Sequence, residues 1–443
     1  MATYNQGIVK VGDPGSAASG YHTRRLFNFS DRVADLAPEE SPFFVYLSKV
    51  AKVPTDDPQF RFLEDRTKVS MTDRGFLLAG SHSIPAAGSS LTYTVDTADG
   101  ASVDWLVKGM VFAVDYTENN APETIIVRVE SSPVDAGSTS TFQGKTISAV
   151  DGAETGADNA KCQVIGTSFA EGTGAPDVFS EELDNDFGFT QIFKTACEMS
   201  NTARATRYRG YADEFQRVWN LKLREHKIDI ERAMLFGQRA STGGIQYTEG
   251  IAGHVVKNGT AVVNDAALTY SSGAPYFRSS TAAELTYDRI LSDFEVVYDP
   301  ARGGTDSKLA LASLPVLTFF NKLGDGLFID ASVGYGNSPM RYDISQKDGI
   351  FGHKVLSVET IHGTMNMVKE PLFRGFSSGY LMMVDLDHVS YRPLVGNGVN
   401  RDTQVMTNVQ SADEDLRKDM ILTEAGLEVS LPETHYLLNL EGV

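Results

Sequence analysis

Cysteine is nearly missing from this chain, which has two, Cys162 and Cys197, in 443 residues. So few cysteines argue against a disulfide framework and fit folding in a reducing cytoplasm. We expect Cys162 in a strand, and Cys197 as a small buried apolar residue in a helix. The eight histidines are scattered, without an H-E-x-x-H motif or a paired C-x-x-C motif. We therefore expect no metal site and no cofactor.

Long apolar runs are also missing. The longest clean run in the C-terminal half is Tyr380–Val384, far short of the ~20 residues that a bilayer-spanning helix needs. The N-terminus has no basic start and no apolar stretch, so it does not look like a secretory signal. We expect no membrane association.

Positive charge is the third shortage, because the net charge is −19. A long basic stripe for gripping nucleic acid is therefore absent. Between Asp96 and Asp186 there are 17 acidic residues and 4 basic ones, and this segment must face water because buried, uncompensated carboxylates are prohibitive. The stretch Lys194–Arg239 is the opposite, with 10 basic and 6 acidic residues.

The first quarter of the chain is poor in core-forming residues. Residues 1–25 show no periodicity, and short helices are expected at 28–36, capped by Ser30, and at 42–50, capped by Ser41. Residues 56–95 resemble an extended hairpin, which cannot stabilise itself in water. We expect neighbouring molecules in a lattice to cover residues 1–50 and 56–95.

The middle of the chain has a strand-rich part followed by a helix-rich part. Short strands punctuated by turns over 96–175 predict a compact all-β unit. The segment Asp184–Thr190 is expected to open a helix-rich region, with Asp184–Asp186 as a helix cap. Apolar residues at three- and four-residue steps predict a helix over 213–236, about 36 Å long, that ends at Gly237.

The rest of the chain mixes helices and strands, so the expected class is α+β. Helices are expected at 287–298, capped by Thr286, and at 315–323. Expected strands are 309–312, 355–358, 380–386, 388–391, 420–423 and 427–431.

Three patterns resemble catalytic or metal-binding motifs, but a purely structural role is the better interpretation of each. Gly375-Phe-Ser377-Ser-Gly379 matches a hydrolase nucleophile elbow, but a strand and not a helix is expected after it. Asp184-x-Asp-x-Gly188 resembles a calcium loop, yet Phe189 and Thr195 stand where glycine and glutamate are needed. His226 lies on the apolar stripe of the long helix, as a packed side chain and not a ligand. We predict no catalytic residue and no enzyme.

The order of several motifs resembles a known family. The run Ile230-Glu-Arg-Ala-Met-Leu-Phe-Gly237 followed by Thr248-Glu-Gly-Ile251 resembles the exit of the spine helix in major capsid proteins of tailed bacteriophages, which have the Hong Kong 97 type fold. The approach Asn185-x-x-x-x-Thr190-Gln-Ile-Phe193 and the closing segment from Val384 to His435 are similar to one branch of that family.

The resemblance implies a domain plan for the chain. It comprises an N-terminal arm (1–50), an extended loop (51–95 and 166–185), a β-rich insertion (96–165), a peripheral domain (186–244 and 385–433) built on the spine helix 213–236, and an axial domain (245–384 and 434–443).

The resemblance also implies a function. It is that of a structural tile that forms hexamers and pentamers in an icosahedral virion shell around double-stranded DNA, without sequence-specific contacts. The partners are a portal and cement, decoration or scaffolding proteins, with synthesis in the bacterial host cytoplasm. The alternatives are an encapsulin-like nanocompartment shell of the same fold and a hydrolase that uses Ser377.

Overall fold

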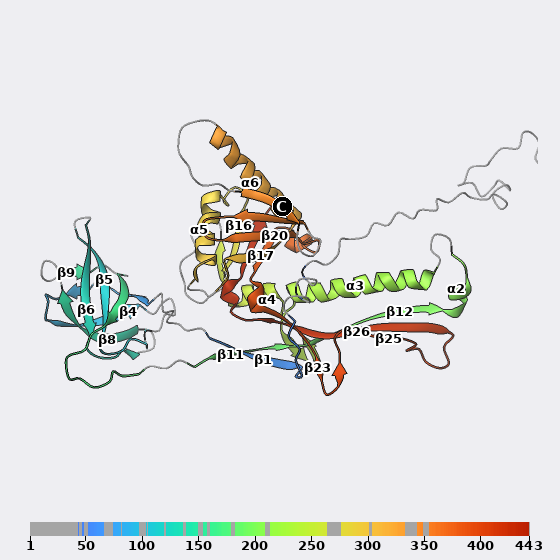
Figure 1. The fold of residues 1–443 in the computed structure, drawn as a ribbon, viewed down its shortest axis with the longest axis horizontal. Coiled ribbons are helices and arrows are strands. Elements are labelled where there is room, and N and C mark those ends of the chain that lie inside the picture. Colours follow the sequence, from blue (N-terminus) through green and yellow to red (C-terminus); the bar gives the residue numbers. More distant parts are fainter. Residues whose placement is uncertain are drawn as a thin grey trace, which may run out of the picture.

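The computed structural model describes residues 43 and 47 and most of 52–442. The gaps are 66–73, 81, 97–102, 104, 119–120, 136–138, 149–153, 157–159, 179–181, 209–212, 264–275, 301–303, 333–342 and 349–353. The described chain is elongated (Figure 1): a β unit at one end joins the body through a thin stem, and a long helix runs toward the other end. The class is α+β, as expected.

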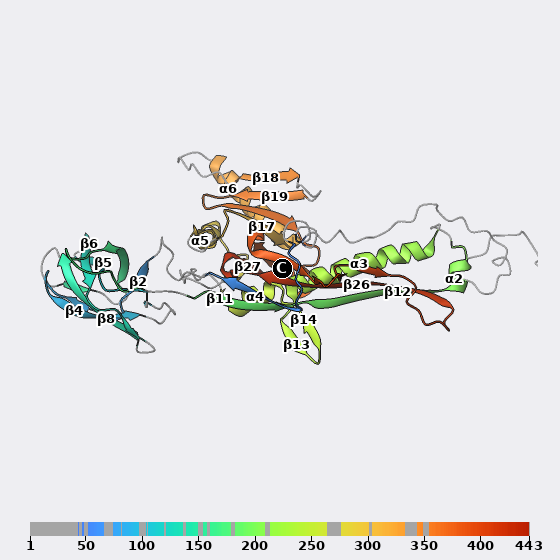
Figure 2. The ribbon, with the colours of Figure 1, turned by 60° about the horizontal axis from the view of Figure 1, so that its bottom comes forward.

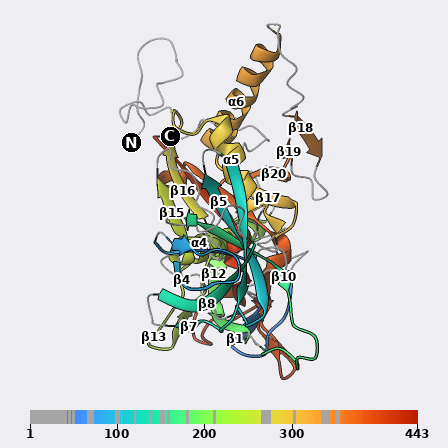
Figure 3. The same cartoon turned by 90° about the vertical axis from the view of Figure 1, so that its left-hand side faces the viewer.

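The β unit has a seven-stranded sheet in the order β2-β10-β5-β6-β8-β4, with β7 on β8. A small pair, β3 and β9, lies beside it. The strands are β2 (Gly75–Leu77), β3 (His82–Ile84), β4 (Ser90–Asp96), β5 (Met110–Glu118), β6 (Ala121–Val129), β7 (Val134–Asp135), β8 (Thr139–Ser148), β9 (Glu154–Gly156) and β10 (Lys161–Thr167). In the end-on view this unit lies in front of the body (Figure 3).

Four aromatic rings form the centre of the β unit. Phe76, Tyr93, Phe112 and Phe142 pack with ring centroids 5.2–6.0 Å apart. Rings in edge-to-face and offset contact stabilise a core beyond their buried area. Two of the four come from the segment 75–95, so the unit begins at Gly75 and not at residue 96. The expectation that a lattice must cover this segment is wrong, because its own chain buries it.

The stem is a two-stranded ribbon of β1 (Gln59–Glu64) and β11 (Asp184–Phe189), antiparallel from Gln59↔Phe189 to Glu64↔Asp184. The helix cap expected at Asp184–Asp186 is therefore wrong, since these residues lie in a strand. The approach is tight at Gly188, where a Cβ atom would lie 2.4 Å from the Phe60 ring. The partner of β1 is thus more than a hundred residues away in sequence, not the second half of a local hairpin.

The body contains a four-stranded sheet, β12-β26-β22 with β25 on β26. Its strands are β12 (Gln191–Ser200), β22 (Val389–Pro393), β25 (Gln404–Met406) and β26 (Leu416–Val429). Cys197 lies in β12, so the helix expected there is wrong. The two closing strands expected at 420–431 are one long strand. The short helix α2 (Asn201–Ala205) follows β12, and the pair β23 (Val395–Gly396) and β24 (Val399–Asn400) follows β22.

Helix α3 (Glu214–Phe236) lies along β12 and β26, and it confirms the expected long helix. Asp213 caps its first turn by accepting from the backbone N–H groups of Phe215 and Gln216. Gly237 ends it, but with an ordinary negative φ. Glycine is needed there because a Cβ atom would lie 2.4 Å from the carbonyl oxygen of Ala233.

The second sheet of the body has eight strands in the order β15-β16-β27-β21-β17-β20-β19-β18. They are β15 (Thr260–Val263), β16 (Tyr276–Thr281), β17 (Ser307–Ala312), β18 (Asp343–Asp348), β19 (Lys354–Glu359), β20 (Thr364–Lys369), β21 (Tyr380–Val384) and β27 (Tyr436–Glu441). Alternate residues face two cores: Leu309 and Leu311 face the core shared with α3 and α4 (Ile251–Asn258), and Ala310 and Ala312 face the core under α5 and α6.

Helices α5 (Tyr287–Val297) and α6 (Leu314–Ser332) confirm two further expectations, and α6 runs nine residues beyond the expected end. Thr286 caps α5, as expected. In Figure 2, β18 and β19 lie at one side of the body, and the hairpin of β13 (Ala240–Thr242) and β14 (Ile245–Tyr247) projects from the opposite side.

Two residues of the N-terminal segment are described, and both are helical and fully buried. Phe43 and Leu47 belong to the core that also contains Ile230, Met234 and Leu235 of α3. The backbone N–H of Phe43 donates to Glu231 Oε1 at 2.8 Å. The expectation that only neighbouring molecules cover this segment is wrong for these two residues. The helix expected at 28–36 lies outside the described residues.

Candidate functional site: a buried polar junction and exposed assembly surfaces

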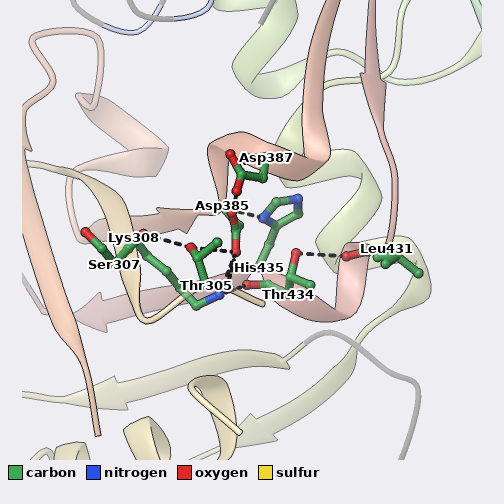
Figure 4. Close-up of polar contacts among 8 residues, drawn as sticks. All are labelled: Thr305, Ser307, Lys308, Asp385, Asp387, Leu431, Thr434 and His435. Atoms are coloured by element: carbon green, nitrogen blue, oxygen red, sulfur yellow. Dashed lines mark hydrogen bonds and ion pairs between the residues drawn. The ribbon is translucent and has the colours of Figure 1, made fainter. Parts of the chain in front are cut away.

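The chain crosses between the two sheets of the body twice near its C-terminal end. It leaves the eight-stranded sheet after β21, passes Asp385, and enters the four-stranded sheet at β22. It returns from β26 through the single turn η5 (Pro432–Thr434) and His435 into β27. The Lys308 side chain of β17 contacts both crossings. We call Thr305, Lys308, Asp385, Thr434 and His435 the junction (Figure 4).

Asp385 is the centre of the junction. Its Oδ2 accepts hydrogen bonds from the Thr305 backbone N–H at 2.7 Å, the Thr305 hydroxyl at 3.0 Å and the Lys308 ammonium at 3.3 Å. Its Oδ1 accepts from the Asp387 backbone N–H at 3.2 Å. Burial alone raises the pKa of this carboxyl, but these donors and the charge of Lys308 outweigh it and lower the pKa below its usual range. Asp385 is therefore an ionised, fully buried carboxylate.

Lys308 joins this carboxylate to the second crossing. Its ammonium also donates to the carbonyl oxygen of Thr434 at 2.9 Å, and both Lys308 and Asp385 are almost completely buried. A buried pair of this kind holds geometry more than it adds stability, but removing one partner strands a charge. The junction thus fixes how the two sheets meet.

His435 completes the junction as a neutral ring. Its Nδ1 accepts from the backbone N–H of Asp385 at 3.1 Å, which leaves the ring proton on Nε2. Burial, with the positive charge of Lys308, lowers the pKa of His435 to about 3. Protonation would place a second positive charge beside Lys308, so the junction is sensitive to acid.

A second cluster anchors the stem to the body. Arg239 donates to Asp186 Oδ1 at 2.8 Å, lies 3.3 Å from Glu249 Oε2, and stacks over the Phe187 ring at 4.3 Å. Its planar guanidinium can pair and stack at once, which lysine cannot do. Arg239, just beyond the end of α3, therefore sets the direction in which the stem leaves the body.

The residues that the sequence singled out are not brought together. Ser377 is buried in the single turn η3 (Gly375–Ser377), before strand β21, and its hydroxyl donates to the Arg374 carbonyl at 3.2 Å. A nucleophile elbow needs a strand before the serine and a helix after it, so this context does not supply one.

His226 bridges the helix and the sheet below it. Its ring nitrogens lie 2.9 Å from Thr195 Oγ1 and 2.8 Å from Thr423 Oγ1. Burial lowers its pKa, so it is a packed neutral side chain with polar partners, as expected of a structural residue. Cys162 and Cys197 are buried and free, and burial raises the pKa of both thiols. Among the described residues, no group of three or more candidate ligands could hold a metal ion.

Nothing in the sequence indicates that the junction residues lie together. Asp385 and His435 stand at the two ends of the closing segment that resembles the capsid family, but Lys308 belongs to no motif, and the three residues are separated by 50 residues or more. The one available signal is that charged residues stand inside apolar runs, as Lys308 does before Leu309 and Asp385 does after Val384.

Exposed apolar side chains mark surfaces that a soluble monomer would be expected to cover. On strand β1 of the stem Leu63 is 66% exposed, and Leu183, directly before β11, is 52% exposed. Others lie on β12, on the β13–β14 hairpin and on η3: Ile192, Ile245, Tyr247 and Phe376. An isolated two-stranded ribbon is marginally stable in water. The stem packs on its own chain through the buried side chains of Phe60, Phe62 and Glu64, so its exposed face and the hairpin are the clearest contact surfaces. None of the described helices is apolar and long enough to cross a membrane.

The basic stretch around α3 is partly neutralised by its own helix. Arg217 pairs with Glu214, Lys222 with Glu225, and Arg232 with Asp229, each three residues apart. Arg224 and Lys227 are exposed. The helix therefore presents a weaker positive surface than the count of basic residues indicates.

A family model, SU10 major capsid protein, matches residues 9–441. The chain belongs to this major capsid protein family. Its subunit is thus a structural component of a capsid, and the expectation from the sequence is confirmed. The family match alone supports this assignment. The argument from uncovered segments does not, because the described parts of residues 1–50 and 75–95 are buried by their own chain.

Several solved structures match the chain at low sequence identity. The capsid of a native GTA particle has a TM-score of 0.43 and 10% identity over 96% of this chain and 98% of that chain. A structure from Microbacterium phage Oxtober96 has a TM-score of 0.43 and 10% identity, over 95% and 97%. The SrpI encapsulin complex from Synechococcus elongatus has a TM-score of 0.36 and 12% identity, over 58% and 77%. None of the curated proteins matches the chain.

Proposed function

We propose that this capsid protein forms hexamers and pentamers in an icosahedral shell that encloses double-stranded DNA. The proposal rests on membership of the capsid family together with a subunit whose stem carries exposed leucines. Such a shell closes by repeating modest interfaces of ~1,600 Å² or less under symmetry.

The described elements support an assignment of the parts. The stem takes the place of the extended loop, and the β unit is an insertion at its end. The four-stranded sheet with α3 corresponds to the peripheral domain, and the eight-stranded sheet with α5 and α6 to the axial domain. The acidic β unit lies outside the shell, where its charge keeps particles apart in solution. Portal, scaffolding and cement proteins complete the particle, which assembles in the bacterial host cytoplasm.

Contact with DNA in this proposal is weak and independent of sequence. Exposed Arg224 and Lys227 attract phosphates, while the paired Arg217 and Lys222 contribute less. Charge reversal at Arg224 should lower the nucleic-acid content of particles more than charge reversal at Lys222. Packaging that is indifferent to both changes would exclude the α3 face from this role.

Electron microscopy of the expressed full chain tests the shell itself. Polyhedral particles are expected for the natural sequence, and Leu63→Asp should abolish them because it places a charge in the stem interface. Val134→Asp is the matched control, since Val134 is 68% exposed on the β unit and Leu63 is 66% exposed on the stem. Particles that form with Leu63→Asp, or a natural chain that stays monomeric at high concentration, contradict the proposal. Particles that contain an enzyme cargo and no DNA would indicate a nanocompartment instead.

A further inference from the structure

Strand β12 forms one edge of the four-stranded sheet. Among the described residues only β26 pairs with it, so no described strand lies along its other edge. The strand is 10 residues long, and its register with β26 is unbroken from Gln191↔Ala425 to Ser200↔Leu416. It contains no proline, no glycine and no bulge. Natural proteins usually interrupt such an edge, because its open N–H and C=O groups pair readily with another chain.

The two faces of β12 differ sharply in burial. On one face Phe193 and Cys197 are buried, and Thr195 hydrogen-bonds to His226 of α3. The other face consists of five exposed side chains: Ile192, Lys194, Ala196, Glu198 and Ser200. In Figure 2, β12 lies below α3 along the body. A partner strand must keep this alternation, because a shift by one residue would bring a buried face to the exposed side.

The exposed face of β12 is complementary in charge to itself. Lys194 and Glu198 stand at equal distances in sequence on either side of Ala196. In an antiparallel pair of two β12 strands centred on Ala196, each copy's Lys194 therefore lies opposite the other copy's Glu198. Moving the register by four residues would place Lys194 opposite Lys194, or Glu198 opposite Glu198, and like charges directly opposite each other destabilise a sheet. A shift by two residues would leave both charges opposite uncharged side chains. Charge thus favours a single register.

Both charges can take part in such a pair. Within the part of the chain that the structure describes, Lys194 forms no ion pair and stands opposite Leu422 of β26. Glu198 Oε2 lies 3.1 Å from the Lys418 ammonium of β26. A carboxylate has two oxygens and accepts from more than one donor. Glu198 can therefore keep Lys418 and accept the Lys194 ammonium of a second copy.

We propose that β12 pairs antiparallel with β12 of a second copy of this chain, across a two-fold axis at Ala196. The pairing joins two four-stranded sheets into one, with both copies of α3 on the same side of it. Such an interface is isologous, since the same residues contribute from each copy. In an icosahedral shell, two-fold axes relate subunits of adjacent capsomers. The contact therefore deepens the proposed shell function, on which it rests, by supplying a link between capsomers.

Cysteine cross-linking of the full chain tests the register, both in the concentrated free subunit and in particles. Directly opposite residues have Cβ atoms about 4.5–5.5 Å apart, so Ala196→Cys should give a disulfide-linked dimer on mild oxidation. Lys194→Cys and Glu198→Cys are the matched controls on the same exposed face. Each should stay monomeric alone, because its two cysteines would lie ~13 Å apart along the paired strands, whereas an equal mixture of the two variants should cross-link. The natural chain should not, because Cys162 and Cys197 are buried.

A charge reversal gives a second, independent measurement. Introduced beside Ala196→Cys, Lys194→Glu turns two attractive pairs into two repulsive ones. It should lower the association constant of the dimer about tenfold, read as the cross-linked fraction at limiting concentration. Lys161→Glu is the control, because Lys161 is an exposed lysine on strand β10 of the β unit, and it should leave the fraction unchanged.

Three results would overturn the proposal: no dimer with Ala196→Cys, equal cross-linking by all three single cysteine variants, or a yield that Lys194→Glu leaves unchanged. If Ala196→Cys fails to fold, the mixture of Lys194→Cys and Glu198→Cys tests the same register. Particles that assemble without the cross-link would exclude this contact and leave the shell function standing. Cross-linked dimers of a chain that never forms particles would support the strand pairing and contradict the shell.

Discussion

Replacing Lys308 by methionine tests whether the junction holds the two sheets together. The change keeps the length of the side chain and leaves the Asp385 carboxylate buried without its cation. Asp385 would retain three donors, the Thr305 N–H, the Thr305 hydroxyl and the Asp387 N–H. These donors limit the loss, and we expect Lys308→Met to cost about 3 kcal/mol, the lower end for a broken buried pair.

The reciprocal change, Asp385→Asn, should cost more. It leaves the Lys308 ammonium with the Thr434 carbonyl and turns an amide N–H toward the donors of Thr305. The cost of Asp385→Asn cannot exceed the free energy of deprotonating Lys308, because the stranded lysine can become neutral instead. At pH 7 that free energy is about 4–5 kcal/mol, from an ordinary lysine pKa of about 10.4. Because each single change strands a partner, the double variant should cost about 2 kcal/mol less than the sum of the two.

Urea unfolding of the free subunit at pH 7 measures these values. The chain has two tryptophans, Trp105 in the β unit and Trp219 on α3, so a Trp105→Phe background isolates the unfolding of the body. Lys222→Met is the matched control, because Lys222 forms an exposed pair with Glu225, and it should leave the midpoint unchanged. A cost below 1 kcal/mol for Lys308→Met, or strict additivity in the double variant, would refute the reasoning.

Three further predictions concern the core, the helix end and acid. Phe112→Ala should destabilise the β unit by about 3–5 kcal/mol, seen in Trp105 fluorescence, with the body transition unaffected; a coupled loss in both would contradict a separate β core. Gly237→Ala should cost about 1–3 kcal/mol in thermal unfolding, because its Cβ would lie 2.4 and 2.5 Å from two backbone oxygens; Gly174→Ala, with open space around it, should be neutral. The buried His435 stays neutral in the folded state, whereas the unfolded state takes up a proton below about pH 6.5. The free energy of unfolding should therefore fall from pH 7 to pH 5 by up to about 1.4 kcal/mol per unit, and a flat profile would disagree.

Elements that depend on local signals were predictable from the sequence. Helix α3 has a capping aspartate, apolar residues at helical spacing and a closing glycine, and each signal operates within a few residues. Strand β17 and helix α5 were predictable for the same reason. The family resemblance was predictable because its motifs surround α3.

The errors occurred where a distant partner decides the structure. Strands β11 and β12 were interpreted as a helix cap and a helix-like run, but β11 pairs with β1 and β12 with β26, more than 100 residues away along the chain. The segment 75–95 looked too poor in apolar residues to fold, yet it joins a core supplied by residues 103–162. Strand formation reflects such non-local packing more than local propensity.

The junction was beyond prediction for a related reason. Its residues gain their roles from two chain crossings that the topology brings beside strand β17, and buried charges carry no periodic signature. The hydrolase elbow at Ser377 could be rejected locally, because an elbow requires particular neighbours in sequence.

The two strands of the stem form one insertion point, through which the β unit is connected to the body. The chain passes out at Glu64 and comes back at Asp184, which face each other across the ribbon. A foreign polypeptide whose own ends lie close together could replace the β unit between Glu64 and Asp184 without a change in the body. With the β unit outside the shell, as proposed, this arrangement would let the subunit carry a foreign polypeptide on the surface of a particle.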